Sequence, residues 1–188
     1  MANKDSARGF WPVKHLTGGL IRPNKYSITT GYTTDIFKGD AVKLVAAGTI
    51  EAAAAGNRFL GVFAGCEYTD ASGNVIFKKY WPNTTTATNI KAYVYDDPNI
   101  VFGIQQATGG SVAATDVGLL GDHVAGTGST VTGQSAHELS GTITTGAAGF
   151  RVLGLWDSPG NAYGEHANLL VQVFEHELAE HGQGTPGV

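Results

Sequence analysis

Apolar and polar residues alternate over short stretches of this chain, and turn residues separate one stretch from the next. KYSITTGY (25–32), GDAVKL (39–44) and KAYVYDD (91–97) alternate with the period of two that is typical of strands with one buried face. RFLGVFAG (58–65) is instead a nearly continuous apolar run, which indicates a strand buried on both faces. The pattern therefore predicts a succession of short β-strands.

Glycine-containing turns join several of these strands into hairpins. Gly48 lies between two strand-like runs in AAGTIEAA, and Gly73 lies in the turn of EYTDASGNVIFKKYW (67–81). Two further strands are expected at 150–156 and 169–175. The chain has 27 Gly, and long helices are not expected because each Gly costs about 1 kcal/mol in a helix interior. We predict a mainly β protein.

Composition divides the chain into three parts. Residues 1–25 form an extended N-terminal arm that is interrupted by Gly and Pro yet rich in apolar side chains. Such an arm needs a surface to lie on, which is either its own domain or a neighbouring protein. Residues 26–106 form a β domain. Residues 107–188 form a Gly/Thr-rich β region that completes or extends it, with a flexible tail from about residue 182.

Charge and cysteine content exclude several classes of partner. The 12 Lys and Arg are scattered among 16 Asp and Glu, so no basic cluster is available to bind nucleic acid. No apolar run approaches the roughly 20 residues of a membrane span. The single cysteine, Cys66, rules out an internal disulfide and suits synthesis in a reducing cytoplasm. We expect the protein to bind no cofactor, no nucleic acid and no membrane.

The stretch VFEHELAEHG (173–182) is the first candidate for chemistry. A zinc-hydrolase helix needs H-E-x-x-H, because positions i and i+4 share one helical face. Here His181 follows His176 by five residues, so the two imidazoles point about 140° apart on an ideal helix. A metal-dependent hydrolase is therefore a remote alternative, and we assign no metal ligand.

The stretch TGQSAHELSG (132–141) is the second candidate, because Ser135 and His137 could act as a nucleophile and its base. A hydrolase elbow needs G-x-S-x-G between a strand and a helix. In this chain the fifth position is His137, and the surroundings are a Gly/Thr-rich loop. We therefore predict no catalytic residue and no enzyme activity.

Tyr and Trp residues gather near strand ends and loops. Their apolar faces and polar tips often anchor protein interfaces, although core packing is the alternative for those on alternating strands. We choose four as possible contacts between subunits: Tyr80, Trp81, Trp156 and Tyr163.

The order of elements over residues 1–106 resembles a family of tailed-phage head proteins. The opening MANKDSARGFWPVKHLTGG is followed by G-D-x-V-x-L (39–44), G-x-I (48–50) and L-G-V-F (60–63), an order similar to that of lambda-type head decoration proteins. The resemblance implies a small β-barrel of the β-tulip type whose N-terminal arm orders on the capsid. Residues 107–188 depart from the minimal decoration domain.

The same resemblance implies a virion structural protein on the outside of the mature capsid, made in the host cytoplasm. Such a cement protein stabilises the head as a homotrimer that clamps adjacent subunits of the major capsid protein. A tail, head-fibre or receptor-facing β module of the virion is the alternative. Removing residues 1–20 is then expected to abolish capsid binding and to leave the β domain folded. The residues that we choose for the capsid contact are Phe10, Trp11, Pro12, Val13, Lys14 and Leu16.

Overall fold

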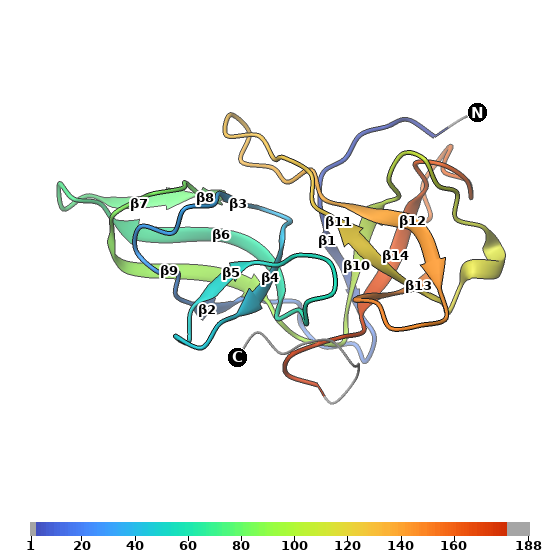
Figure 1. Cartoon of the computed structure of the whole chain (residues 1–188), viewed down its shortest axis with the longest axis horizontal. Helices are drawn as coiled ribbons and strands as arrows, with labels where there is room; N and C mark the ends of the chain where they lie inside the picture. Colours follow the sequence, from blue (N-terminus) through green and yellow to red (C-terminus); the bar gives the residue numbers. More distant parts are fainter. Residues whose placement is uncertain (1–2, 180–188) are drawn as a thin grey trace.

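The chain folds into two β lobes that lie side by side along the long axis of the molecule (Figure 1). The computed structural model describes residues 3–179. Its strands pair antiparallel, and the one helical element among the described residues is a 3-10 turn, η1, at Ala114–Asp116. The prediction of a mainly β protein is confirmed, and both predicted hairpins form.

The first lobe contains residues 24–95. We call it the inserted lobe because, along the sequence, it is inserted between two strands that are neighbours in the sheet of the other lobe. Its main sheet has the order β2–β9–β6–β4–β5, with β7 paired to the distal half of β6. A short ladder of β3 and β8 completes it. The strands are β2 (Asn24–Tyr26), β3 (Ile36–Phe37), β4 (Ala41–Leu44), β5 (Ile50–Ala52), β6 (Gly61–Thr69), β7 (Val75–Lys78), β8 (Tyr80–Trp81) and β9 (Thr88–Tyr95).

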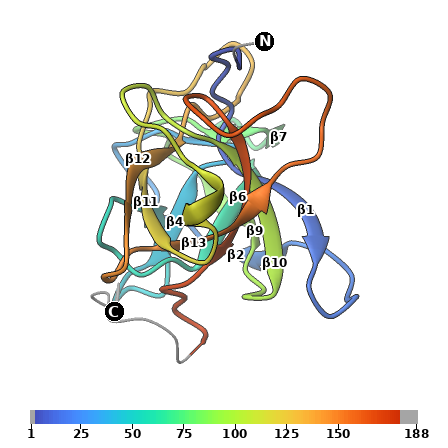
Figure 2. The same ribbon diagram turned by 90° about the vertical axis from the view of Figure 1, so that its right-hand side faces the viewer.

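The second lobe, which we call the terminal lobe, combines strands from both ends of the described chain. Its sheet has the order β1–β10–β14–β13–β11–β12. The sheet curls around its core (Figure 2), and Ala107 after β10 donates to the carbonyl of Leu139 on β12 over 2.8 Å. The strands are β1 (Trp11–His15), β10 (Ile100–Gln105), β11 (Leu120–Val124), β12 (Glu138–Thr144), β13 (Phe150–Leu155) and β14 (Asn168–Val173).

The boundary between the lobes differs from the predicted one. β9 ends at Tyr95 and β10 begins at Ile100 in the other sheet, so the chain crosses at residues 96–99 and not after residue 106. Alternation marks both segments as strands but carries no information on which sheet receives them. Residues 107–179 are not an independent extension, because they form one sheet with β1 and β10. The predicted tail from about residue 182 lies outside the described residues.

The N-terminal arm lies on its own domain, which was one of its two expected surfaces. Residues 11–15 pair with β10. Phe10 is 2% exposed and stacks on Phe150 at a centroid distance of 4.5 Å, with Phe102 edge-on at 6.3 Å. Phe10 is therefore part of the terminal lobe's core. The prediction that it contacts the capsid is corrected, since reaching a partner would require opening that core.

The buried apolar side chains form two clusters, one centred on each lobe. In the inserted lobe, Phe63 and Trp81 are among the fully buried side chains. In the terminal lobe, Phe10, Phe102 and Phe150 meet, and this cluster extends across the boundary between the lobes. It also contains Ala41, Ala53, Phe59 and Val62 of the inserted lobe. None of the described residues forms a helix that is long and apolar enough to cross a membrane.

Candidate binding groove

Two tryptophans meet on the surface of the terminal lobe. Trp11 begins β1 and Trp156 directly follows β13, and their ring centroids lie 5.4 Å apart with the planes at 69°. Both side chains are half-buried. A Cβ on Gly103 of β10 would overlap the Trp11 ring. The glycine therefore makes room for the indole against the neighbouring strand.

The guanidinium of Arg8 stacks on this tryptophan pair. Its central carbon is 3.9 Å from the ring centroid of Trp11 and 5.4 Å from that of Trp156. It makes no hydrogen bond or ion pair with another described residue. Cation–π attraction holds the group in place and leaves its N–H donors free for a ligand.

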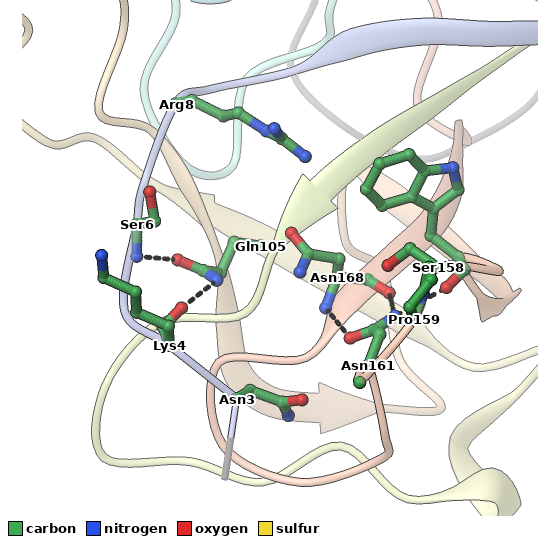
Figure 3. Close-up of a pocket in the computed structure, with 11 residues that line it drawn as sticks. Asn3, Lys4, Ser6, Arg8, Gln105, Ser158, Pro159, Asn161 and Asn168 are labelled. Atoms are coloured by element: carbon green, nitrogen blue, oxygen red, sulfur yellow. Dashed lines mark hydrogen bonds between the residues drawn. The ribbon is translucent and has the colours of Figure 1, made fainter. Parts of the chain in front are cut away.

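Two hollows flank Arg8 and share it and Trp156 as walls. The larger, of about 480 Å³, lies between the lobes and is mainly apolar. The smaller, of about 380 Å³, is lined by amide and hydroxyl side chains, and Arg8 points into it (Figure 3). We call the two hollows together the Arg8 groove. The larger is lined by Arg8, Phe10, Trp11, Pro12, Lys38, Val62, Phe63, Tyr95, Gln134 and Trp156.

The smaller hollow is held in shape by the arm. The side chain of Gln105 on β10 donates to the carbonyl of Lys4 over 2.9 Å and accepts from the Ser6 amide over 2.6 Å (Figure 3). Across the hollow, Asn161 bonds the backbone of Asn168 in both directions, at 2.9 Å each. The Asn168 carboxamide itself has no partner among the described residues. The hollow therefore keeps a free donor and acceptor.

The Arg8 groove is uniformly positive. Lys4, Arg8 and Lys38 line it, and no Asp or Glu does so among the described residues. The chain as a whole is acidic, with a net charge of −4. An anionic group is therefore attracted to the groove despite the sign of the whole protein.

The structure separates the six arm residues predicted to contact the capsid. Trp11 and Pro12 line the Arg8 groove, whereas Phe10 forms only its floor. Val13 is half-buried, and Lys14 and Leu16 are exposed on and after the edge strand β1. Only part of the predicted contact is therefore available to a partner.

The four predicted subunit contacts also separate. Trp156 lies in the groove, Tyr163 is exposed on the loop before β14, and Tyr80 stacks on Phe37 at 5.4 Å. Trp81 is fully buried in the inserted lobe and packs edge-on against Tyr68. Its prediction as an interface residue is corrected, because β8 turns the indole into the core.

Residues 176–179, the described part of the HELAEH stretch, join the lobes. His176 is buried, its Nδ1 accepts from the amide of Leu178 over 3.0 Å, and its ring bonds the backbone of Asp96. Glu177 accepts the amide of Leu44 with both carboxylate oxygens, at 3.1 and 3.0 Å. The imidazole is therefore committed to backbone partners, and His181 lies outside the described residues.

Ser135 and His137 lie close to an aspartate, but their side chains are not linked as in a hydrolase. His137 Nε2 is 3.4 Å from Oδ1 of Asp40, and Ser135 Oγ accepts the amide of His137 over 2.9 Å. In a catalytic triad the histidine stands between serine and aspartate. Here Nδ1 of His137 has no hydrogen-bond partner among the described residues, so the imidazole accepts no proton from Ser135 Oγ, and all three side chains are buried. The site is closed to substrate.

These residues and His123 form a buried polar seam between the lobes. His123 stacks on His137 at a centroid distance of 4.9 Å and bonds the carbonyl of Ala53 over 3.1 Å. Burial lowers the pKa of His123 and of His137 to about 4. Burial also raises the pKa of Asp40 to about 6, although hydrogen bonds from Ser135 and Phe37 oppose the shift. Between about pH 4 and pH 6 both histidines are neutral and Asp40 is protonated, so the seam carries no charge in that range.

One group among the described residues has the composition of a metal site. Asp5, Glu138 and His166 each offer a ligand atom within 4.8 Å of the others. Burial and the charge of Asp5 raise the pKa of Glu138. Asp5 is exposed on the arm. Exposed carboxylates of this kind are common without an ion, so the group alone does not define a metal centre.

Sequence reasoning missed Arg8, the cation at the centre of the groove. Trp11 and Trp156 were selected for separate roles, and no local pattern relates residues so far apart. The only signal for Arg8 was its position three residues before Trp11, which local spacing cannot interpret.

Comparison of the chain with protein-family models, with curated proteins and with solved structures gave no match.

Proposed function

We propose that the protein is a virion structural protein that binds the outer surface of a mature phage capsid and stabilises it. The observation that carries this proposal is the Arg8 groove, where two half-buried tryptophans and a stacked arginine are accessible. Trp, Tyr and Arg are the residues that dominate binding energy at protein interfaces. The resemblance of residues 1–106 to head decoration proteins supplies the kind of partner, the major capsid protein.

The proposed stabilisation is a mass-action effect. A protein that binds the expanded shell and not its disassembled subunits stabilises the shell by RT ln(1 + [L]/Kd), about 2.7 kcal/mol at a concentration of 100 Kd. No enzyme activity, cofactor or metal takes part in this proposal. We also propose that the protein acts as a homotrimer on the capsid exterior, as the resemblance implies.

The second candidate function is a tail, head-fibre or receptor-facing module of the virion. The same groove would serve it, because a protein-binding groove does not identify its partner. Copy number separates the two functions. A shell protein is present in proportion to capsid subunits, whereas a tail or fibre component is present in far fewer copies.

The proposal is tested by co-sedimentation of the purified chain with heads of the encoding phage that lack it. We expect saturable binding by the native chain, and a Kd raised roughly thirtyfold by Trp156→Ala, as for an interface tryptophan worth about 2 kcal/mol. Leu20→Ala is the matched control, because Leu20 is an 85% exposed apolar residue on the loop between β1 and β2. Absence of binding by the native chain would refute the proposed function.

A further inference from the structure

The two hollows of the Arg8 groove differ in chemistry, and this difference describes a ligand. The larger hollow offers apolar surface from Trp11, Val62 and Tyr95. The smaller offers the free carboxamide of Asn168 and the hydroxyl groups of Ser6 and Ser158. Arg8 stands between them and lines both. A ligand that fills the groove therefore has an apolar part, an anionic centre and a polar part, in that order.

We propose that the Arg8 groove binds an extended segment of the partner protein that presents an internal Asp or Glu to Arg8. An apolar side chain on one side of this acid enters the larger hollow. The segment continues on the other side over Asn168, whose carboxamide bonds its backbone. The proposal rests on the proposed function for one point, that the partner is a protein of the virion.

The geometry of Arg8 favours a carboxylate as the anionic centre. A guanidinium presents paired N–H donors that match the two oxygens of a carboxylate. Stacking on Trp11 and Trp156 already orders the side chain, so less conformational entropy is lost when the ion pair forms. The rings also limit the access of water to one side of the guanidinium, which strengthens the attraction.

The arrangement favours an internal acid over the carboxylate of a chain end. A chain end would stop at Arg8 and leave one hollow empty. Both hollows open from the same arginine, and the partner chain can therefore pass through the groove and use both. The apolar residue and the backbone contacts then add affinity to that of the ion pair.

The groove also separates this ligand from a polynucleotide. The groove has three cationic side chains, and two of them, Lys4 and Lys38, lie in different hollows on either side of Arg8. Nucleic acid binding depends on neutralising several phosphates along a continuous basic track. One central cation with apolar surface beside it matches a single carboxylate on a peptide better.

The test uses overlapping peptides that cover the major capsid protein of the encoding phage, acetylated and amidated so that they carry no terminal charge. Binding to the full chain is followed by tryptophan fluorescence, because two of the three tryptophans line the groove and Trp81 is buried. We expect the bound peptides to share an acid next to an apolar residue. Arg8→Gln raises their Kd about tenfold, the effect of one charged hydrogen-bonded pair.

A double-mutant cycle completes the test. Replacing the peptide acid by its amide is expected to weaken binding to the native chain about tenfold and to leave binding to the Arg8→Gln chain unchanged. Arg151→Gln is the matched control, since Arg151 also stacks on an aromatic ring, that of Phe174 at 4.6 Å, outside the groove. Additive effects in the cycle would overturn the proposed ion pair.

The outcomes separate the inference from the proposed function. If the native chain binds heads and Arg8→Gln binds them equally well, the groove inference is wrong and the proposed function stands. If the chain does not bind heads, the proposed function fails. Binding of an oligonucleotide but of no peptide, or an Arg8-dependent self-association seen by sedimentation, would replace the partner proposed here and overturn the inference.

Discussion

The two lobes have similar strand content but are built in opposite ways. The inserted lobe comes from one continuous stretch, residues 24–95, whereas the terminal lobe needs β1 from the N-terminal end and β10–β14 from after residue 99. They also differ in charge. Residues 24–95 hold seven Lys and Arg against five Asp and Glu, a net charge of +2, which leaves −6 for the rest of a chain of net charge −4.

The terminal lobe is expected to be the more sensitive of the two to single substitutions. A lobe closed within one continuous stretch pays little loop-closure entropy, whereas a lobe that joins distant segments depends on each of them. The terminal lobe depends most on Phe10, because this one side chain contacts Phe102 and Phe150 from two other strands.

The largest effect of a single substitution is expected from Phe10→Ala. Removing a buried phenylalanine typically costs 3–5 kcal/mol, and we expect this loss in the free energy of unfolding of the terminal lobe. Phe10 is not a member of the cluster around Phe63 and Trp81, so the part of the inserted lobe that is built on that cluster should retain its melting transition. Calorimetry resolves the two transitions, and Phe77→Ala is the control because Phe77 is exposed.

For the same reason, removal of residues 1–20 is not expected to leave the whole protein folded. That deletion removes β1 and Phe10 and therefore unfolds the terminal lobe, so loss of capsid binding in the truncated chain would not locate the contact. A single cooperative transition in the native chain, lost as a whole in Phe10→Ala, would contradict the independence of the lobes.

Acidification of the seam between the lobes is also expected to lower stability. His123 and His137 have a pKa of about 4 in the folded chain against an ordinary value of 6.5, and burial lowers the pKa of His176 to about 4 as well. The unfolded chain therefore binds more protons than the folded one below pH 6.5, and stability falls between pH 6.5 and 4.

Asp40 opposes this trend. Its pKa is about 6 when folded against 3.8 as the ordinary value, so the folded chain gains a proton as the pH falls from 6 and is stabilised. Three imidazoles lose about 2.5 pKa units each and one carboxyl gains about 2, so we expect a net loss in the free energy of unfolding on the order of 7 kcal/mol between pH 6.5 and 4, at about 1.4 kcal/mol per pKa unit. Urea unfolding at a series of pH values measures it. His137→Gln should flatten the slope, and a stability independent of pH would contradict the seam's role.

The sequence predicted where the strands lie but not how they assemble into two sheets. Alternation located the hairpins around Gly48 and Gly73, because side chains on a strand follow a period of two whatever the sheet. It could not show that β10 leaves the sheet of β9, since burial looks the same in either lobe. Trp81 and Trp156 show the same limit at the candidate site. Both lie at strand ends, and only the tertiary fold buries the first and leaves the second half-buried at the surface.

The smallest effect on stability, and the sharpest on association, is expected on the inserted lobe. Phe77 is 71% exposed and Val75 is 57% exposed on β7, with Lys78 and Lys79 next in sequence. A subunit contact of the proposed trimer that brings this basic, apolar face to the acidic terminal lobe of the next copy would be heterologous, and such a contact closes into a three-membered ring when it rotates each copy by a third of a turn. Phe77→Ser should change the free energy of unfolding by no more than about 0.5 kcal/mol, as for other exposed sites. It should shift sedimentation from trimer towards monomer, as should high salt.

Val131→Ser, at a 93% exposed residue of the loop before β12, is the control. If both variants sediment like the native chain, this face is not the subunit contact.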